Sequence, residues 1–320
     1  MSYEDDGSRL AASNPPLDRA RLYSFIDDYL DALENKDTRS LPVTENVRFS
    51  ENNRLMPLGT GAWETVTALD RRYEIRAADP AGGQVGYVGT VRLGDTASFL
   101  AIRLHIEDNL ISEIETIVPG TSVSKLFSAA TANLEHARSV FSDAIPPSAR
   151  DSRSQLLFVA NAYYEGLEQE DSHPVPFADD CHRIENGVAL TNNPDFHYGY
   201  VAANGTELPN FAAMGCMEVA NSGMFNADLI NARRYPIVDE EHGIVFAFTF
   251  YQARAKGTPT FSPIYGELIP DDRHQRRRTL VMLEVFKVVE GRITAMESVW
   301  SVEEPTWQSV WWTGMDRGGR

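Results

Sequence analysis

Apolar residues return every three or four positions between residues 17 and 36, and again between residues 152 and 170. That spacing is typical of a helix that packs on one side, so we expect two amphipathic helices. Each predicted helix is followed by a short predicted strand, at 47–50 and at 181–184. Runs of β-branched and aromatic residues then predict four strands per half, at 73–77, 84–93, 98–106 and 111–118, and at 235–238, 244–253, 279–289 and 293–302. A helix followed by antiparallel strands favours the α+β class over an alternating parallel fold.

The chain contains one unit written twice. A shift of 134 residues aligns 22–52 with 156–186 without a gap, and eight of the 31 aligned positions are identical. The sequence Arg-Arg-Tyr that begins at Arg71 recurs at Arg233, a shift of 162, and a third match lies at a shift of 182. Because the matches keep their order, an internal duplication explains them. The growing shift means that the second copy carries 28 extra residues before its Arg-Arg-Tyr and 20 more after it.

The duplication divides the chain. It predicts a flexible N-terminus (1–15), a first domain (16–120), a linker (121–150), a second domain with insertions (151–302) and an aromatic C-terminal tail (303–320). Four of the five tryptophans lie between residues 300 and 312. We therefore expect the tail to pack on a partner copy, to close a pocket or to join a subunit interface.

Three stretches of sequence point to a known fold family. The first copy contains Val-Arg-Phe-Ser-Glu-Asn at 47–52, and the second contains Phe-Ala-Asp-Asp-Cys-His-Arg-Ile-Glu-Asn-Gly at 177–187 and Arg-Arg-Tyr-Pro-Ile-Val-Asp-Glu-Glu at 233–241. With the element order above, the chain resembles a tandem pair of nuclear transport factor 2-like, or SnoaL-like, domains. That resemblance implies two cone-shaped α+β barrels, each with a pocket between its helix and its concave sheet. Because this family includes isomerases, cyclases, dehydratases, lyases, hydrolases and binding modules, the fold alone does not select a reaction.

The second short strand carries the first candidate chemistry. Alternation along a strand places Cys181, Arg183 and Glu185 on one face and His182 and Ile184 on the other. One face then holds an Arg–carboxylate pair, or else His182 enters the pocket as a general acid or base whose pKa is tuned by burial. The third interpretation is a solvated edge strand with an ion pair that fixes the turn. We predict His182 and Arg183 as catalytic residues.

The first copy holds Val47 and Phe49 where the second holds Cys181 and Arg183. We therefore expect an apolar first domain and a second domain with polar side chains in its interior. The further catalytic candidates are His197, in the first insertion, and Arg234, which could stabilise an oxyanion. Aromatic, methionine and a few polar side chains typically line pockets for flat apolar ligands, so we predict that substrate contacts Tyr164, Tyr198, Cys216, Met217, Glu218 and Phe225.

Composition narrows the partners. The 46 acidic residues outnumber the 29 basic ones, for a formal charge of −17, which disfavours binding to nucleic acid or anionic membranes. No apolar run has the length of a membrane span and the first residues lack the order of a signal peptide, so we predict a cytoplasmic protein. Cys181 and Cys216 alone could pair, which excludes a disulfide framework and a cysteine-rich metal site.

These features lead to a functional hypothesis. We predict a cofactor-independent acid/base lyase that removes water, a proton or a small carbonyl fragment from a hydrophobic, aromatic molecule, with lignin-derived diaryl alcohols as one analogy. A SnoaL-like isomerase or cyclase of polyketide or steroid-type substrates is the first alternative. A non-catalytic ligand-binding or dimerisation module is the second, and a homo-oligomer is compatible with both. A metal site of His182, His197 and Glu218 has no support in their spacing, so we predict no metal.

Overall fold

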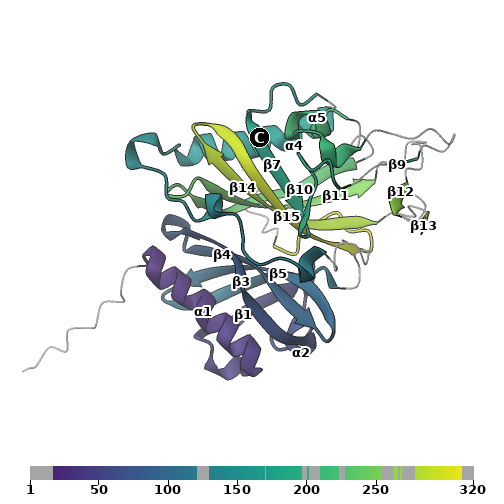
Figure 1. Cartoon of the computed structure of the whole chain (residues 1–320). Helices are drawn as coiled ribbons and strands as arrows, with labels where there is room; N and C mark the ends of the chain where they lie inside the picture. Colours follow the sequence, from purple (N-terminus) through teal and green to yellow (C-terminus); the bar gives the residue numbers. More distant parts are fainter. Residues whose placement is uncertain are drawn as a thin grey trace, which may run out of the picture.

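The computed structural model describes residues 17–120, 130–169, 171–196, 200–201, 210–222, 228–253, 262–265, 267–268 and 278–311. The predicted N-terminal segment 1–15 therefore lies outside the described residues, as do His197, Tyr198 and Phe225. Within the described part, two six-stranded sheets dominate the structure, and each has one long helix against it. Figure 1 shows the first sheet in purple and blue below the second in green and yellow.

The first domain begins with helix α1 (Arg19–Asn35) and ends with strand β6. Asp18 starts the helix because its side chain accepts a hydrogen bond from the Arg21 amide, and Lys36 ends it in a left-handed conformation. The elements that follow α1 are β1 (Val43–Glu51), β2 (Arg54–Leu55), α2 (Ala62–Thr65), β3 (Val66–Asp79), β4 (Gln84–Leu93), β5 (Thr96–Glu107) and β6 (Leu110–Ile117). The sheet order is β2-β1-β6-β5-β4-β3.

The second domain repeats that plan. Its elements are α4 (Arg153–Gln169), β7 (Phe177–Glu185), β8 (Val188–Ala189), α5 (Cys216–Ala220), β10 (Asp228–Asp239), β11 (Ile244–Ala253), β14 (Thr279–Val289) and β15 (Arg292–Glu303). The order β10-β11-β14-β15-β7-β8 mirrors the first sheet. A small third sheet joins β9 (Tyr200–Val201), β12 (Ser262–Tyr265) and β13 (Glu267–Leu268), all from insertions of the second copy.

The α+β class and the tandem arrangement are confirmed, with two corrections. Neither sheet is purely antiparallel, because β1 runs parallel to β6 and β7 runs parallel to β15. Neither sheet is a closed barrel, since the terminal strands of each order are not paired with each other. The two strands of each parallel pair are separated in the chain by the other strands of their sheet. No hairpin therefore joins them, and they are free to pair in parallel.

The two sheets pack against each other through one apolar cluster that draws residues from both domains. Two ion pairs with equivalent positions in the repeat cross between the domains: Arg19 to Asp239 at 2.6 Å and Arg153 to Asp79 at 2.7 Å. Each aspartate also accepts a backbone amide of the other domain, from Ala78 or Val238. The duplicated chain therefore contains an internal, two-fold-like interface.

The aromatic tail returns to the first domain. Trp311 donates its indole N–H to the Ser50 hydroxyl at 2.8 Å, and the guanidinium groups of Arg48 and Arg103 lie 4.5 and 4.9 Å from its ring centroid. Trp307 is exposed, and residues 312–320 lie outside the described part. The described tail thus covers the first domain of its own chain.

Candidate functional site

A group of polar side chains is buried between α4 and the second sheet. Glu284, on β14, has an exposed fraction of 0%. The Tyr251 hydroxyl donates a hydrogen bond to its Oε2 at 3.0 Å, and the Ser298 hydroxyl donates to its Oε1 at 3.3 Å. A glutamate in the middle of an apolar strand faces inward here because β14 alternates, and it lies on the same face as Met282 and Phe286.

Strand β7 adds an ion pair to this group. Arg183 is buried, pairs with Glu185 two residues further along the same face, and has its Nη2 3.7 Å from Glu284 Oε1. The alternation expected from the sequence is observed, since Cys181, Arg183 and Glu185 are buried and His182 and Ile184 are half-buried. One cation is therefore placed between two carboxyl groups inside the second domain.

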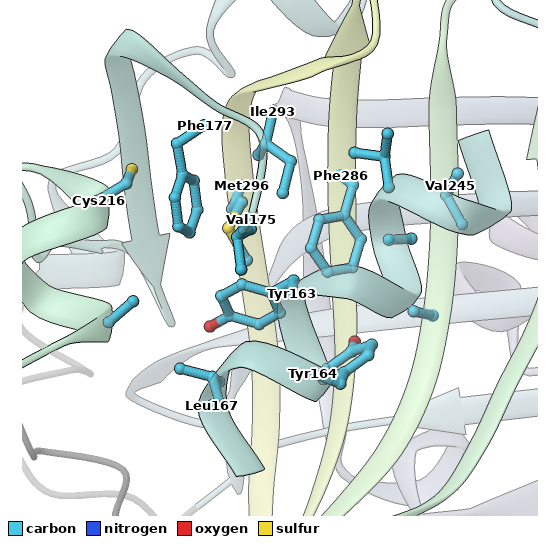
Figure 2. Packing of buried hydrophobic residues seen from close by; sticks show 14 of the residues in the cluster. Tyr163, Tyr164, Leu167, Val175, Phe177, Cys216, Val245, Phe286, Ile293 and Met296 are labelled. Atoms are coloured by element: carbon cyan, nitrogen blue, oxygen red, sulfur yellow. The ribbon is translucent and has the colours of Figure 1, made fainter. Parts of the chain in front are cut away.

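Helix α4 contributes two tyrosines. Tyr163 and Tyr164 are buried at consecutive positions, and their rings meet edge to face at 5.3 Å between centroids. Figure 2 shows both rings projecting from α4 among the apolar side chains of the sheet, with Phe286 nearby. We refer to Tyr163, Tyr164, Arg183, Glu185, Tyr251, Glu284 and Ser298 as the inner polar cluster.

Burial sets the protonation of the inner polar cluster. Loss of hydration raises the pKa of the Glu284 carboxyl, and the Arg183 charge and the tyrosine hydrogen bonds offset part of that rise. Burial, and then the neighbouring Glu284 charge, raises the pKa of Tyr164 and of Tyr251 well above the usual tyrosine range. Both tyrosines therefore keep their protons as hydrogen-bond donors, while the carboxyl group can gain or release one.

The first domain has no such cluster at the equivalent positions. Strands β4 and β5 pair in the same register as β11 and β14, which places Val91 where Tyr251 stands and Ile102 where Glu284 stands. Phe49 replaces Arg183, and Leu30 replaces Tyr164. Glu51, which corresponds to Glu185, therefore has no arginine two positions before it and instead accepts a hydrogen bond from the Ala62 amide at 2.8 Å. The polar interior is thus specific to the second domain.

Two of the predicted catalytic residues lie outside the inner polar cluster. His182 is half-buried on the opposite face of β7, where burial and the Arg138 charge lower its pKa. Arg234 reaches Glu115 of the first domain at 2.5 Å and lies 5.2 Å from the Phe248 ring centroid, within the interface between the sheets. The expectation that Arg234 stabilises an oxyanion inside the second domain is therefore corrected, because its β-strand position faces the other sheet.

The predicted substrate-binding residues separate in a similar way. Tyr164 belongs to the inner polar cluster. Cys216 does not offer a free thiol, because it forms a disulfide with Cys181. Met217 is partly buried against the apolar core of the second domain. Glu218 accepts a hydrogen bond from the Gly215 amide at 2.8 Å, which gives that N–H a partner at the start of α5.

Sequence reasoning missed Glu284 and Tyr251. The available signal was a single glutamate within the otherwise apolar stretch Leu-Val-Met-Leu-Glu-Val-Phe at 280–286. An unpaired acid in such a run indicates a buried polar group that needs partners. Its significance emerges only when β14 is placed beside β11 and β7, which the local pattern does not reveal.

Among the described residues, no three His, Cys, Asp or Glu side chains lie together in an arrangement that could hold a metal ion. The predicted absence of metal and cofactor stays a prediction, because His197 lies outside that part of the chain.

Comparisons with known proteins match only parts of the chain. A family model described as a domain of unknown function (DUF8021) matches residues 149–300, just under half of the chain. No curated protein gives a significant match. The crystal structure of a "putative ketosteroid isomerase" from Kribbella flavida is similar to part of the chain, with 18% identity and a TM-score of 0.25, over 33% of this chain and 82% of that one. A TM-score this low supports no inference about activity, so the fold assignment rests on the strand order and the position of the helices.

Proposed function

We propose that the second domain is a cofactor-independent acid/base catalyst that acts on a small hydrophobic, aromatic molecule, as a lyase. The observation that supports this proposal is the inner polar cluster, which places a carboxyl group of raised pKa beside tyrosine hydroxyls within an apolar interior. The first domain, with Ile102 and Val91 at the equivalent positions, acts as the structural partner.

Each member of the cluster has a role that fits its chemistry. Glu284, when ionised, accepts a proton from a carbon next to an activating group. Tyr164 donates a hydrogen bond to the oxygen that gains negative charge, and its raised pKa keeps it protonated while it does so, whereas Tyr251 donates its one hydroxyl proton to Glu284. Arg183 balances the charge of the carboxylates. Return of the proton to the leaving oxygen or carbon completes an elimination without a metal or cofactor.

This assignment changes the predicted base. The sequence favoured His182 or His197, whereas the buried Glu284 now takes that role. His182 lies on the opposite face of β7 and can serve as a comparison residue. We infer that substituting His182 with Asn changes turnover by less than about threefold, because the side chain does not reach the inner polar cluster.

A substitution at Glu284 tests the proposal directly. The full chain is incubated with phenolic diaryl alcohols and with β,γ-unsaturated ketones, and products are followed by mass spectrometry. Glu284→Gln keeps the shape of the side chain and should reduce turnover by about 10²–10⁴-fold, the usual contribution of a general acid/base. The matched control is Glu297→Gln, because Glu297 is equally buried in the same domain but faces the first sheet.

The proposal requires that Glu284→Gln lose turnover and that Glu297→Gln keep it. Equal turnover by wild type and Glu284→Gln would exclude Glu284 as the proton carrier. The wild-type rate should also rise with pH through the raised pKa of Glu284, since the base must be ionised.

Isomerisation or cyclisation of polyketide or steroid-type substrates is the second reaction that this geometry fits. It uses the same proton transfer but returns the proton to another carbon of the same molecule. The product mass distinguishes the two reactions, because elimination lowers the mass and isomerisation leaves it unchanged.

A non-catalytic module remains the alternative from another class. It is favoured by the pairing of Arg183 with Glu185 and Glu284, which can serve to hold α4 and the sheet together. In that case Glu284→Gln would alter the free energy of unfolding without any turnover to lose, and the substrate panel would give no product with wild type.

The partners follow from charge and composition. The net charge of −17 disfavours a nucleic acid partner, and the apolar side chains around the inner polar cluster favour a small hydrophobic or aromatic molecule as substrate. None of the described helices combines the length and the apolar character that a membrane crossing requires. For the compartment, the sequence predicted the cytoplasm, but the disulfide between Cys181 and Cys216 favours an oxidising environment.

A further inference from the structure

The disulfide ties together two elements that both domains contain, but only the second domain has the two cysteines. Cys181 lies in β7 and Cys216 begins α5, 35 residues further along the chain. Both are buried in the apolar cluster of the second domain, and Figure 2 labels Cys216 among the side chains of that cluster. The first domain has Val47 at the position of Cys181, and its short helix α2, which like α5 follows a glycine N-cap and precedes the long strand, begins with Ala62 instead of a cysteine.

The position of β7 in the sheet explains why a tie is useful there. One edge of β7 pairs with β15 along its length, but its other edge pairs with β8 only at Ile184 and Glu185. Cys181 lies just beyond that short pairing, two residues before Arg183 and on the same face. A covalent bond at Cys181 therefore restrains the strand where its second strand partner ends.

Hydrogen bonds extend this restraint toward Arg183. The Arg183 amide donates to the Thr191 hydroxyl at 2.7 Å, and the Asn192 side chain donates to the Cys181 carbonyl at 2.9 Å. The Asn192 amide donates to the Met214 carbonyl at 2.9 Å, just before α5. These contacts and the disulfide connect β7, the segment after β8 and α5 into one unit around Arg183.

We propose that the Cys181–Cys216 disulfide positions Arg183 and Glu185 beside Glu284, and so orders the site of the second domain. The two cysteines are positioning residues, since they act through β7. A buried cation between two carboxyl groups needs a fixed geometry, because a small displacement leaves charges unpaired inside the protein. The first domain has Phe49 in place of Arg183 and has no need of such a restraint.

Two substitutions in the full chain break the disulfide with different side chains. Cys181→Val installs the residue of the first domain, and Cys216→Ala acts from the side of α5. The matched control is Phe49→Ala, which removes a buried ring from the first domain and leaves the second untouched. Each of the three should lower Tm by roughly 5–10 °C, so a loss of stability alone does not separate them.

The readout that separates them is local. Hydrogen–deuterium exchange at 25 °C should be about tenfold faster over residues 178–185 in both cysteine variants and unchanged there in Phe49→Ala. Binding of β-naphthol, an aromatic alcohol followed by its fluorescence, should weaken about tenfold in the cysteine variants only. Unchanged exchange in β7, or unchanged β-naphthol affinity despite faster exchange, would overturn the positioning role.

The β-naphthol readout rests on the proposed function, whereas the exchange readout does not. If wild type fails to bind β-naphthol and shows no turnover, the proposed function fails. The exchange measurement then still decides whether the disulfide orders β7 around Arg183.

Discussion

The two domains have the same order of helices and strands, but one has apolar side chains where the other has polar and charged ones. Between α1 and its sheet, Leu30, Phe49, Val91 and Ile102 form an apolar interior. Between α4 and its sheet, the equivalent positions hold Tyr164, Arg183, Tyr251 and Glu284. Because burying a charge costs several kcal/mol unless it is paired, the second arrangement is a poor way to achieve stability alone. The difference teaches that one copy supports the fold and the other can specialise.

The first and largest test removes the cation from the second domain. Arg183→Met leaves Glu185 and Glu284 buried without their partner and should cost about 3–5 kcal/mol in the free energy of unfolding, measured by urea denaturation. The double substitution Arg183→Phe with Glu284→Ile installs the residues of the first domain. It should recover part of that loss, because Glu284 is removed while Glu185 stays buried without its cation, and a double variant as unstable as the single one would contradict the comparison.

The second test compares two equivalent glutamates at the interface between the sheets. Glu115 is paired with Arg103 at 2.9 Å and with Arg234. Glu297 has Val285 in place of the cross-strand arginine, and it receives a hydrogen bond from Tyr73. Burial raises the pKa of Glu297 to about 7, with Tyr73 and the Arg138 charge opposing the rise.

A raised pKa in the folded state means that folding favours the protonated form. The stability contributed by protonated Glu297 is therefore complete below the unfolded pKa of 4.5 and is lost as the pH rises through about 7. Glu297→Gln should remove this pH dependence. At pH 8 the free energy of unfolding of the variant should exceed that of wild type by up to about 3 kcal/mol. Glu115→Gln should instead destabilise at pH 8, because it removes the carboxylate paired with Arg234 and leaves Arg103 with Glu113 alone. Thermal unfolding at pH 5 and pH 8 measures both.

The smallest effect is expected on the outer face of α4. Phe158 has an exposed fraction of 65%, and the repeat places Ser24 at the equivalent position of α1. Phe158→Ser should change the free energy of unfolding by no more than about 0.5 kcal/mol, since little apolar area leaves the core. A larger loss of stability in chemical denaturation would mean that the two helices are not equivalent on their outer faces.

Local patterns predicted much of the fold. The stripe of Leu22, Ile26 and Tyr29 correctly indicated an amphipathic helix, and the tandem repeat correctly indicated two domains of one class. The parallel pairing of β1 with β6 could not be predicted in this way, because hydrogen bonding between distant strands leaves no local period. The same limit explains why Arg234 was assigned to the site, although its strand faces the other sheet.

By itself, the sequence determined the periodicities, the duplication and the concentration of polar residues in the second copy. Those properties follow from side chains that are neighbours along one helix or strand. Only the tertiary structure decided that Glu284, Tyr251 and Arg183 meet, that Cys181 joins Cys216, and that the sheets pack face to face. These contacts join residues far apart in the chain. They form because burial of the shared apolar faces brings the strands together and leaves the enclosed polar groups to find partners with one another.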